Sequence, residues 1–280
     1  MKDYRRNDLT FDVRDAGPAD GPVVVLLHGF PQHNDSWNAV IDRLTAAGYR
    51  CLAPNQRGYS PGARPSRRRD YRMDELVADL GALIDASGAP RVQLVGHDWG
   101  AAVAWAAAVQ MPERLATVSP ISVPHPAAFI KSFTNSRQGL ASWYMFFFQL
   151  PRIPEWLLMR RNGVMASESL RRGGQSAAAA DRDVAAMREP GAMTAAINWY
   201  RALPLSNPRA IDQKVSVPTL YVWSDKDIAL LPKAAHDTAR YVSGDYRFEI
   251  LPGVSHWIPD EQPDKLADLL LDWFAAHPVD

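Results

Sequence analysis

Short, fully apolar runs that alternate with helical segments constrain the fold of this chain more than any other feature. The run VVVLL (23–27) is rich in β-branched residues and short, so it predicts a strand that is buried on both faces. Further strands are expected at 49–55, 91–96 and 115–123, with helices between them at 36–49, 73–88 and 101–110. Strand and helix alternating at this spacing predict right-handed crossovers and a doubly wound, mostly parallel sheet in an α/β protein.

The alternation stops between residues 124 and 214. This segment is helical, aromatic and rich in arginine, and it has no strand signal. The pattern then resumes with strands expected at 217–223 and 247–253 and a closing helix at 265–277. The sequence therefore predicts a core in two parts with a helical cap inserted between them, over 1–123, 124–214 and 215–280.

The composition is that of an ordinary globular protein. Hydrophobic residues make up 47% and charged residues 22%, and 31 basic residues balance 31 acidic ones. This balance predicts neither a nucleic-acid partner nor a membrane partner, and no apolar stretch reaches the ~20 residues of a membrane span. The single cysteine, Cys51, excludes an intramolecular disulfide, and the N-terminus lacks an apolar signal region, so a cytoplasmic location is expected.

The segment LVGHDWGA (94–101) places an aspartate at the tip of a predicted strand–turn–helix. Asp98 lies between Gly96 and Gly100, after the strand RVQLV and before an alanine-rich helix. This spacing matches the nucleophile elbow of α/β hydrolases, a sharp turn that exposes one side chain above the sheet. Aspartate among glycines also occurs in ordinary turns. The flanking strand and helix favour the elbow, with Asp98 as its nucleophile and an α/β-hydrolase fold around it.

The elbow requires an acid and a histidine later in the chain, in that order. His256 follows the last predicted strand, at the end of the sheet where catalytic groups collect, and is the expected base. No Asp or Glu occurs from Leu115 to Ser142, so the acid is expected after the strand at 217–223. Asp227 is favoured there because it lies deeper in the loop, whereas Asp225 could cap the following turn.

Backbone amides are expected to complete the site. The loop HGFP (28–31) ends the first apolar strand, so the N–H groups of Phe30 and Trp99 are the expected oxyanion hole. His97 is adjacent to the nucleophile, but neighbouring side chains diverge in a sharp turn. His97 is therefore expected to point toward the core. Neither a metal ion nor a cofactor is expected.

An aspartate nucleophile suits displacement at saturated carbon. A carboxylate that attacks such a carbon forms an ester that water can cleave, whereas a serine would form a stable ether. Asp98 is ionised without help, so His256, oriented by Asp227, is free to activate water. Epoxides and alkyl halides are the candidate substrates. They differ because an epoxide leaves as a basic alkoxide that needs a proton donor.

The predicted cap adds two further motifs, Y-x-x-x-F-Q-x-P (144–151) and NWYR (198–201). With these, nearly the whole chain resembles the α/β-hydrolase-fold epoxide hydrolases of the soluble and microsomal kind. The resemblance implies that Tyr144 and Tyr200 hold the epoxide oxygen and supply its proton. It also implies that a small apolar epoxide and water react to give a vicinal diol. Apolar residues expected to bind the substrate are Pro31, Trp37, Phe148, Trp199 and Trp257.

Two alternatives stay open. A haloalkane or haloacid dehalogenase could use the same Asp–His–Asp set, and the indole of Trp99 would suit a halide. However, Phe30 stands where haloalkane dehalogenases usually have Asn. The residues WGAA that follow Asp98 also contain no Arg to hold the carboxylate of a haloacid. A protein retained for binding is the second alternative. The aromatic run WYMFFF (143–148) could touch a membrane or a partner, and the basic run PSRRRDYR (65–72) could bind polyanions. The sequence favours aromatics that line the substrate pocket, and it leaves the oligomeric state, a homodimer included, undetermined.

Overall fold

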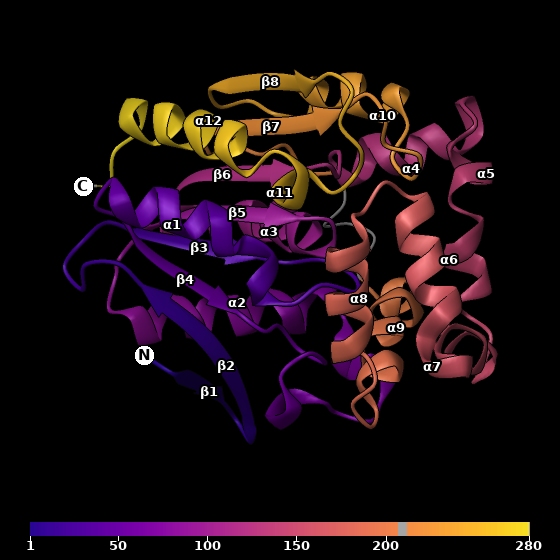
Figure 1. Cartoon of the computed structure of the whole chain (residues 1–280). Helices are drawn as coiled ribbons and strands as arrows, with labels where there is room; N and C mark the ends of the chain where they lie inside the picture. Colours follow the sequence, from indigo (N-terminus) through magenta and orange to yellow (C-terminus); the bar gives the residue numbers. More distant parts are fainter. Residues whose placement is uncertain (207–211, 280) are drawn as a thin grey trace.

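A single twisted sheet forms the core of the protein, in a computed structural model that describes residues 1–206 and 212–279 (Figure 1). Its strands lie in the order β1-β2-β4-β3-β5-β6-β7-β8. They are β1 (Asp3–Arg6), β2 (Leu9–Ala16), β3 (Val23–Leu27), β4 (Arg50–Pro54), β5 (Val92–His97), β6 (Leu115–Ile121), β7 (Thr219–Ser224) and β8 (Tyr246–Leu251). The pairs β1–β2 and β2–β4 are antiparallel, and the others are parallel. The predicted α/β-hydrolase sheet is therefore confirmed.

Helices cover both faces of the sheet. The helices of the core are α1 (Asn38–Ala46), α2 (Met73–Ser87), α3 (Trp99–Gln110), α10 (Pro232–Asp237), α11 (Ile258–Glu261) and α12 (Pro263–Ala276). In β3, Val23, Val25 and Leu27 join the hydrophobic cluster that contains residues of α2 and α3. The alternate residues Val24 and Leu26 join the cluster that contains residues of α1 and α12. Because both faces are covered, every residue of this strand is apolar.

The segment between β6 and β7 consists mainly of helices and contains no strand in its described part. It comprises α4 (Pro126–Asn135), α5 (Gln138–Ala141), α6 (Trp143–Phe147), α7 (Ile153–Arg172), α8 (Ala177–Ala186) and α9 (Ala192–Ala202). Figure 1 shows α6, α8 and α9 beyond the arrowheads of the parallel strands. The predicted cap extends to residue 214, and its stretch 207–211 lies outside the described residues.

The antiparallel β1–β2 hairpin was not predicted from the sequence. Its strands alternate apolar and polar residues because one face packs on the core: Phe11 and Val13 are buried, and Tyr4 stacks on Phe11 with ring centroids 4.7 Å apart. The expected helix at 36–49 begins instead as a 3-10 turn, Asn34–Trp37, before α1. The alternation in LTFDVRDA (9–16) was the available signal for the second strand.

Candidate active site

Asp98 occupies a strained turn between β5 and α3. Its φ of 51° lies in the left-handed region, which a non-glycine residue rarely adopts. The turn depends on close backbone approach, because a Cβ atom on Gly96 would overlap the carbonyl of Gly100. A Cβ atom on Gly100 would in turn overlap the carbonyl of Leu27. Gly96 therefore allows α3 to begin close to the end of β5, and Gly100 allows it to lie against the end of β3; together they form the sharp turn that carries Asp98.

The two oxygens of the Asp98 carboxylate meet different groups. Oδ1 accepts a hydrogen bond from the N–H of Phe30 at 2.8 Å, and Oδ2 lies 3.3 Å from Nε2 of His256. The N–H of Trp99, the second expected donor, is the first amide of α3 and has no acceptor within that helix. The site thus holds the carboxylate between a backbone donor, a helix N-terminus and an imidazole.

His256 pairs with Asp227 on its other ring nitrogen. Nδ1 of His256 lies 2.6 Å from Oδ2 of Asp227, whose Oδ1 accepts the N–H groups of Ala229 and Leu230. Asp225 lies elsewhere, because its Oδ1 accepts the N–H of Gly253 at 2.7 Å. The structure therefore places Asp227, and not Asp225, beside the expected base.

The contacts of His256 with Asp227 and Asp98 determine the charges of His256 and Asp98. Burial alone would lower the pKa of His256, but Asp227 and then Asp98 raise it to about 10. Burial alone would raise the pKa of the Asp98 carboxyl, but the hydrogen bond and charge of His256 lower it below its ordinary value. The resting site therefore contains an ionised Asp98 beside an imidazolium that two carboxylates stabilise.

His97 and its neighbours hold the loop that carries His256. The side chain of His97 is buried, as expected, and its Nε2 lies 2.9 Å from the carbonyl oxygen of His256. The hydroxyl of Ser122 donates to that same oxygen at 2.9 Å. Nδ1 of His97 contacts Gln32, which donates to Asp260. These hydrogen bonds hold the backbone of His256 in place.

A cavity of about 1080 Å³ opens beside Asp98. Tyr144 from α6 and Tyr200 from α9 both line it, and their ring centroids lie 6.0 Å apart. Burial and then the charge of Asp98 raise the pKa of both phenols above the ordinary value. Both hydroxyls therefore remain protonated and can act as hydrogen-bond donors toward the cavity.

The residues that line the cavity differ from those expected for substrate binding. Pro31, Trp37, Phe148, Trp199 and Trp257 are not among the residues that line it, and a role for them in substrate binding stays a prediction. The cavity is lined instead by apolar side chains of α3, α4 and α6 that were not predicted, among them Ala102, Trp105, Ala106, Val109, Phe129, Ile130, Phe133 and Met145. The sequence contained a pattern that indicates this lining, because residues 102, 105, 106 and 109 follow the spacing of one face of a helix.

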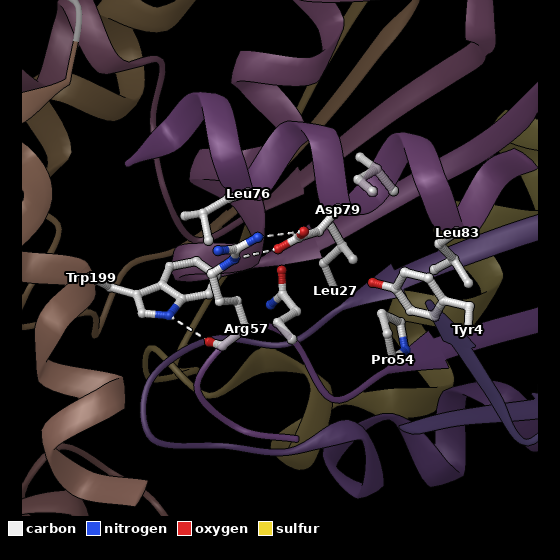
Figure 2. A pocket seen from close by; sticks show the side chains of 10 residues that line it. Tyr4, Leu27, Pro54, Arg57, Leu76, Asp79, Leu83 and Trp199 are labelled. Carbon is white, nitrogen blue, oxygen red and sulfur yellow. Dashed lines mark hydrogen bonds and ion pairs between the residues drawn. The ribbon is translucent and has the colours of Figure 1, made fainter. Parts of the chain in front are cut away.

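Each of the five expected residues packs elsewhere. Trp37 is fully buried in the core with α1, and Trp199 donates its indole N–H to the carbonyl of Arg57 at 2.8 Å beside a separate pocket of about 10 Å³ (Figure 2). Phe148 packs against Tyr200, with ring centroids 4.8 Å apart. Trp257 packs edge-on against His256, and Pro31 is buried in the loop after β3. Of the five, Phe148 and Trp257 therefore contact candidate catalytic side chains directly.

Within residues 1–206 and 212–279, no cluster of three or more His, Cys, Asp or Glu side chains could hold a metal ion.

The sheet order and the strained aspartate turn define the architecture of an α/β hydrolase. A family model described as the alpha/beta hydrolase fold matches residues 22–263, and the chain belongs to this family. It is 36% identical over 273 residues to the AB hydrolase superfamily protein YfhM of Bacillus subtilis, covering 95% of each chain. It is 34% identical to Epoxide hydrolase 3 of Xenopus tropicalis, covering 98% of this chain and 76% of that one.

A solved structure supports the same relationship. The crystal structure of Epoxide Hydrolase A from Mycobacterium thermoresistibile matches with a TM-score of 0.85 and 26% identity, over 99% of this chain and 98% of that chain. The resemblance to epoxide hydrolases that the motifs indicated is therefore confirmed in sequence and in fold.

Proposed function

We propose that the protein hydrolyses epoxides to vicinal diols through a covalent ester on Asp98. One observation carries the proposal: an ionised Asp98 and the two protonated phenols of Tyr144 and Tyr200 line the same cavity. This combination offers a nucleophile for the epoxide carbon and proton donors for its oxygen. Relatives named epoxide hydrolases, at 34% identity over nearly the whole chain, support it.

The first half-reaction forms the ester. A carboxylate oxygen of Asp98 attacks one epoxide carbon, and the electrons of the breaking C–O bond pass to the ring oxygen. Tyr144 or Tyr200 donates a proton to that oxygen, which becomes the first hydroxyl of the diol. The phenol that donates the proton is left as a tyrosinate.

The second half-reaction hydrolyses the ester. Nε2 of His256 accepts a proton from water, and the resulting hydroxide attacks the ester carbonyl of Asp98. The N–H groups of Phe30 and Trp99 stabilise the oxyanion. Before this step, esterification has removed one of the two negative charges that raise the pKa of His256. The imidazolium proton then passes through solvent to the tyrosinate left by the first half-reaction, so Nε2 is free to act as the base. Collapse of the intermediate breaks the bond to the diol oxygen, and the proton of the new carboxyl passes to that oxygen. The diol then leaves an ionised Asp98 and a protonated His256, as in the resting site.

Dehalogenation is not favoured as the alternative. A halide leaving group gains little from a phenolic proton, so two cavity-facing phenols would have no role in it. One relative and the solved structure reported above are named epoxide hydrolases.

The proposal also assigns a role to the helical segment and a class of substrate to the cavity. Residues 124–214 would act as a cap, since they supply Tyr144 and Tyr200 to the cavity. A small apolar epoxide suits a lining that is mainly apolar. A cytoplasmic location stays a prediction from the sequence, which leaves a homodimer undetermined.

The covalent route is tested by a single turnover in ¹⁸O-water. The ester mechanism transfers a solvent oxygen to the Asp98 carboxylate, so mass spectrometry should find label in the peptide that contains Asp98. Label that appears in the diol and is absent from the protein would show direct attack of water on the epoxide.

The choice between Asp227 and Asp225 is tested by matched substitutions. Asp227→Asn removes the charge that orients and stabilises the His256 imidazolium, so turnover should fall by ~10²-fold or more. Asp225→Asn keeps an oxygen that can accept the N–H of Gly253, so turnover should stay close to wild type. Steady-state hydrolysis of styrene oxide measures both. A damaging Asp225→Asn beside a harmless Asp227→Asn would reverse the assignment.

A further inference from the structure

Large apolar side chains project into solvent from α5, α6 and the start of α7. We define the apolar patch as six residues with their exposed fractions: Leu140 77%, Trp143 63%, Phe146 66%, Leu150 43%, Ile153 50% and Trp156 63%. In Figure 1 these helices lie at the edge of the molecule, on the side away from β1 and β2. The run WYMFFF therefore faces two ways, because Tyr144 and Met145 line the cavity while Trp143 and Phe146 point outward.

Basic side chains are interleaved with the apolar patch. The exposed ones are Lys131, Arg137, Arg152, Arg160 and Arg161. Within the described parts of the chain, none of these five has a carboxylate within salt-bridge distance. The guanidinium of Arg160 instead lies over the ring of Trp156, 4.9 Å from its centroid.

Acidic residues do not offset this charge. The segment 126–172 contains two, Glu155 and Glu168. Glu155 pairs with the buried Arg201 at 2.6 Å, and Glu168 lies 3.8 Å from Arg172. The same segment contains seven Lys and Arg residues, so it carries a net positive charge although the net charge of the whole chain is zero.

We propose that the apolar patch and its arginines dock the protein reversibly onto an anionic lipid surface. Tryptophan and phenylalanine favour the boundary between headgroups and acyl chains, and arginine side chains can extend from that depth to the lipid phosphates. Anionic headgroups attract unpaired basic residues that lie close to the surface. The two features are adjacent in the chain and are exposed together, as such docking requires.

The charge pattern favours lipid over a second copy of the chain. Two identical patches related by a twofold axis would bring Arg152, Arg160 and Arg161 of both copies close together. Like charges at such an interface are unfavourable, and the two acids of segment 126–172 already pair with Arg201 and Arg172. An anionic bilayer satisfies the same arginines without this conflict.

The expectation of no membrane partner rested on the balanced total charge. That balance is an average over the chain, and it cannot reveal a basic, aromatic side. No helix in residues 1–206 or 212–279 is long and apolar enough to cross a bilayer. The docking proposed here is adsorption to the lipid surface.

The position of the cavity suggests what docking would achieve. Ile130 and Phe133 of α4 line the cavity, and α4 packs against α5, which carries Leu140 of the patch. Ile130 is itself 52% exposed. Resting on the proposed function, an apolar epoxide dissolved in the bilayer would then enter the cavity close to the membrane. The docking itself does not depend on that activity.

The test is co-sedimentation of the full chain with vesicles, without substrate. Vesicles of phosphatidylcholine with one quarter phosphatidylglycerol should bind the protein at least ~10-fold more tightly than phosphatidylcholine alone, and high salt should weaken the binding. Phe146→Ser with Trp156→Ser should reduce binding by ~10-fold or more, as should Arg152→Gln, Arg160→Gln and Arg161→Gln together.

Matched controls use exposed residues outside the patch. Arg67→Gln, Arg68→Gln and Arg69→Gln remove the same charge from the basic run near α2, and Ile250→Ser removes an exposed apolar residue of β8. These variants should bind vesicles more tightly than the patch variants do. All variants should hydrolyse styrene oxide at the wild-type rate without vesicles, so a failure of the proposed activity is recognised separately.

Three results would overturn the proposal. One is equal binding to neutral and anionic vesicles, and another is an equal loss of binding in the control variants. The third is a wild-type dimer in sedimentation velocity that Phe146→Ser with Trp156→Ser converts to a monomer, because a second copy would then occupy the patch.

Discussion

A His256→Gln variant is expected to react once with an epoxide and then to stop as the Asp98 ester. Glutamine cannot accept a proton from water, so ester hydrolysis should slow by ~10²–10⁴-fold. Ester formation should continue, because the N–H of Phe30 still donates to the Asp98 carboxylate and lowers its pKa, and the two phenols remain to protonate the epoxide oxygen. Rapid-quench kinetics should show a burst close to one equivalent, and intact-mass measurement should show the added mass of one epoxide.

An exposed histidine provides the matched control. His236→Gln changes a side chain on α10, away from Asp98, and should turn over at nearly the wild-type rate. Normal turnover of His256→Gln, or loss of turnover without an ester, would remove His256 from the role of base.

The charge of the site predicts the pH dependence of ester hydrolysis. The pKa of His256 is raised to about 10 while Asp227 and Asp98 are both ionised. The ester removes the Asp98 charge, so the pKa of His256 should fall below that value in the intermediate. Because only the neutral imidazole accepts a proton, single-turnover hydrolysis should rise with pH and level off below pH 10.

The positions of the candidate catalytic residues could be anticipated from the sequence, because these residues are attached to strand ends. Phe30 follows β3, Asp98 follows β5, Asp227 follows β7 and His256 follows β8. Parallel strands end at one edge of a sheet, so any four loops of this kind are brought close together. The direction of each side chain mattered less than the position of its loop, and the structure brings all four residues together.

The pocket could not be anticipated in the same way, because it depends on which face each helical residue occupies. Trp199 and Tyr200 are adjacent in α9, and successive residues of a helix point about 100° apart. Tyr200 therefore faces the cavity, whereas Trp199 faces the core near Arg57. Aromatic composition alone identifies neither direction. The same geometry separates Tyr144 from the exposed Trp143.

Removing both phenols of the cavity is expected to distinguish an epoxide hydrolase from a dehalogenase. The alkoxide that forms as the epoxide opens is strongly basic, and Tyr144 and Tyr200 are the protonated donors beside Asp98. Tyr144→Phe or Tyr200→Phe alone should slow ester formation, because one phenol remains to supply the proton. The double variant should slow it by at least ~10²–10⁴-fold, the usual contribution of general acid catalysis.

The measurement is single-turnover ester formation with styrene oxide and, in parallel, with a bromoalkane. Tyr246→Phe is the matched control, because it removes a phenol hydroxyl on β8 that has no hydrogen-bond partner among the described residues. It should react at the wild-type rate, and thermal unfolding should show that every variant is folded. A halide leaves without a proton, so any activity on the bromoalkane should tolerate the double substitution. Near-wild-type opening of styrene oxide by the double variant, or a wild-type preference for the bromoalkane, would refute epoxide hydrolysis assisted by these phenols.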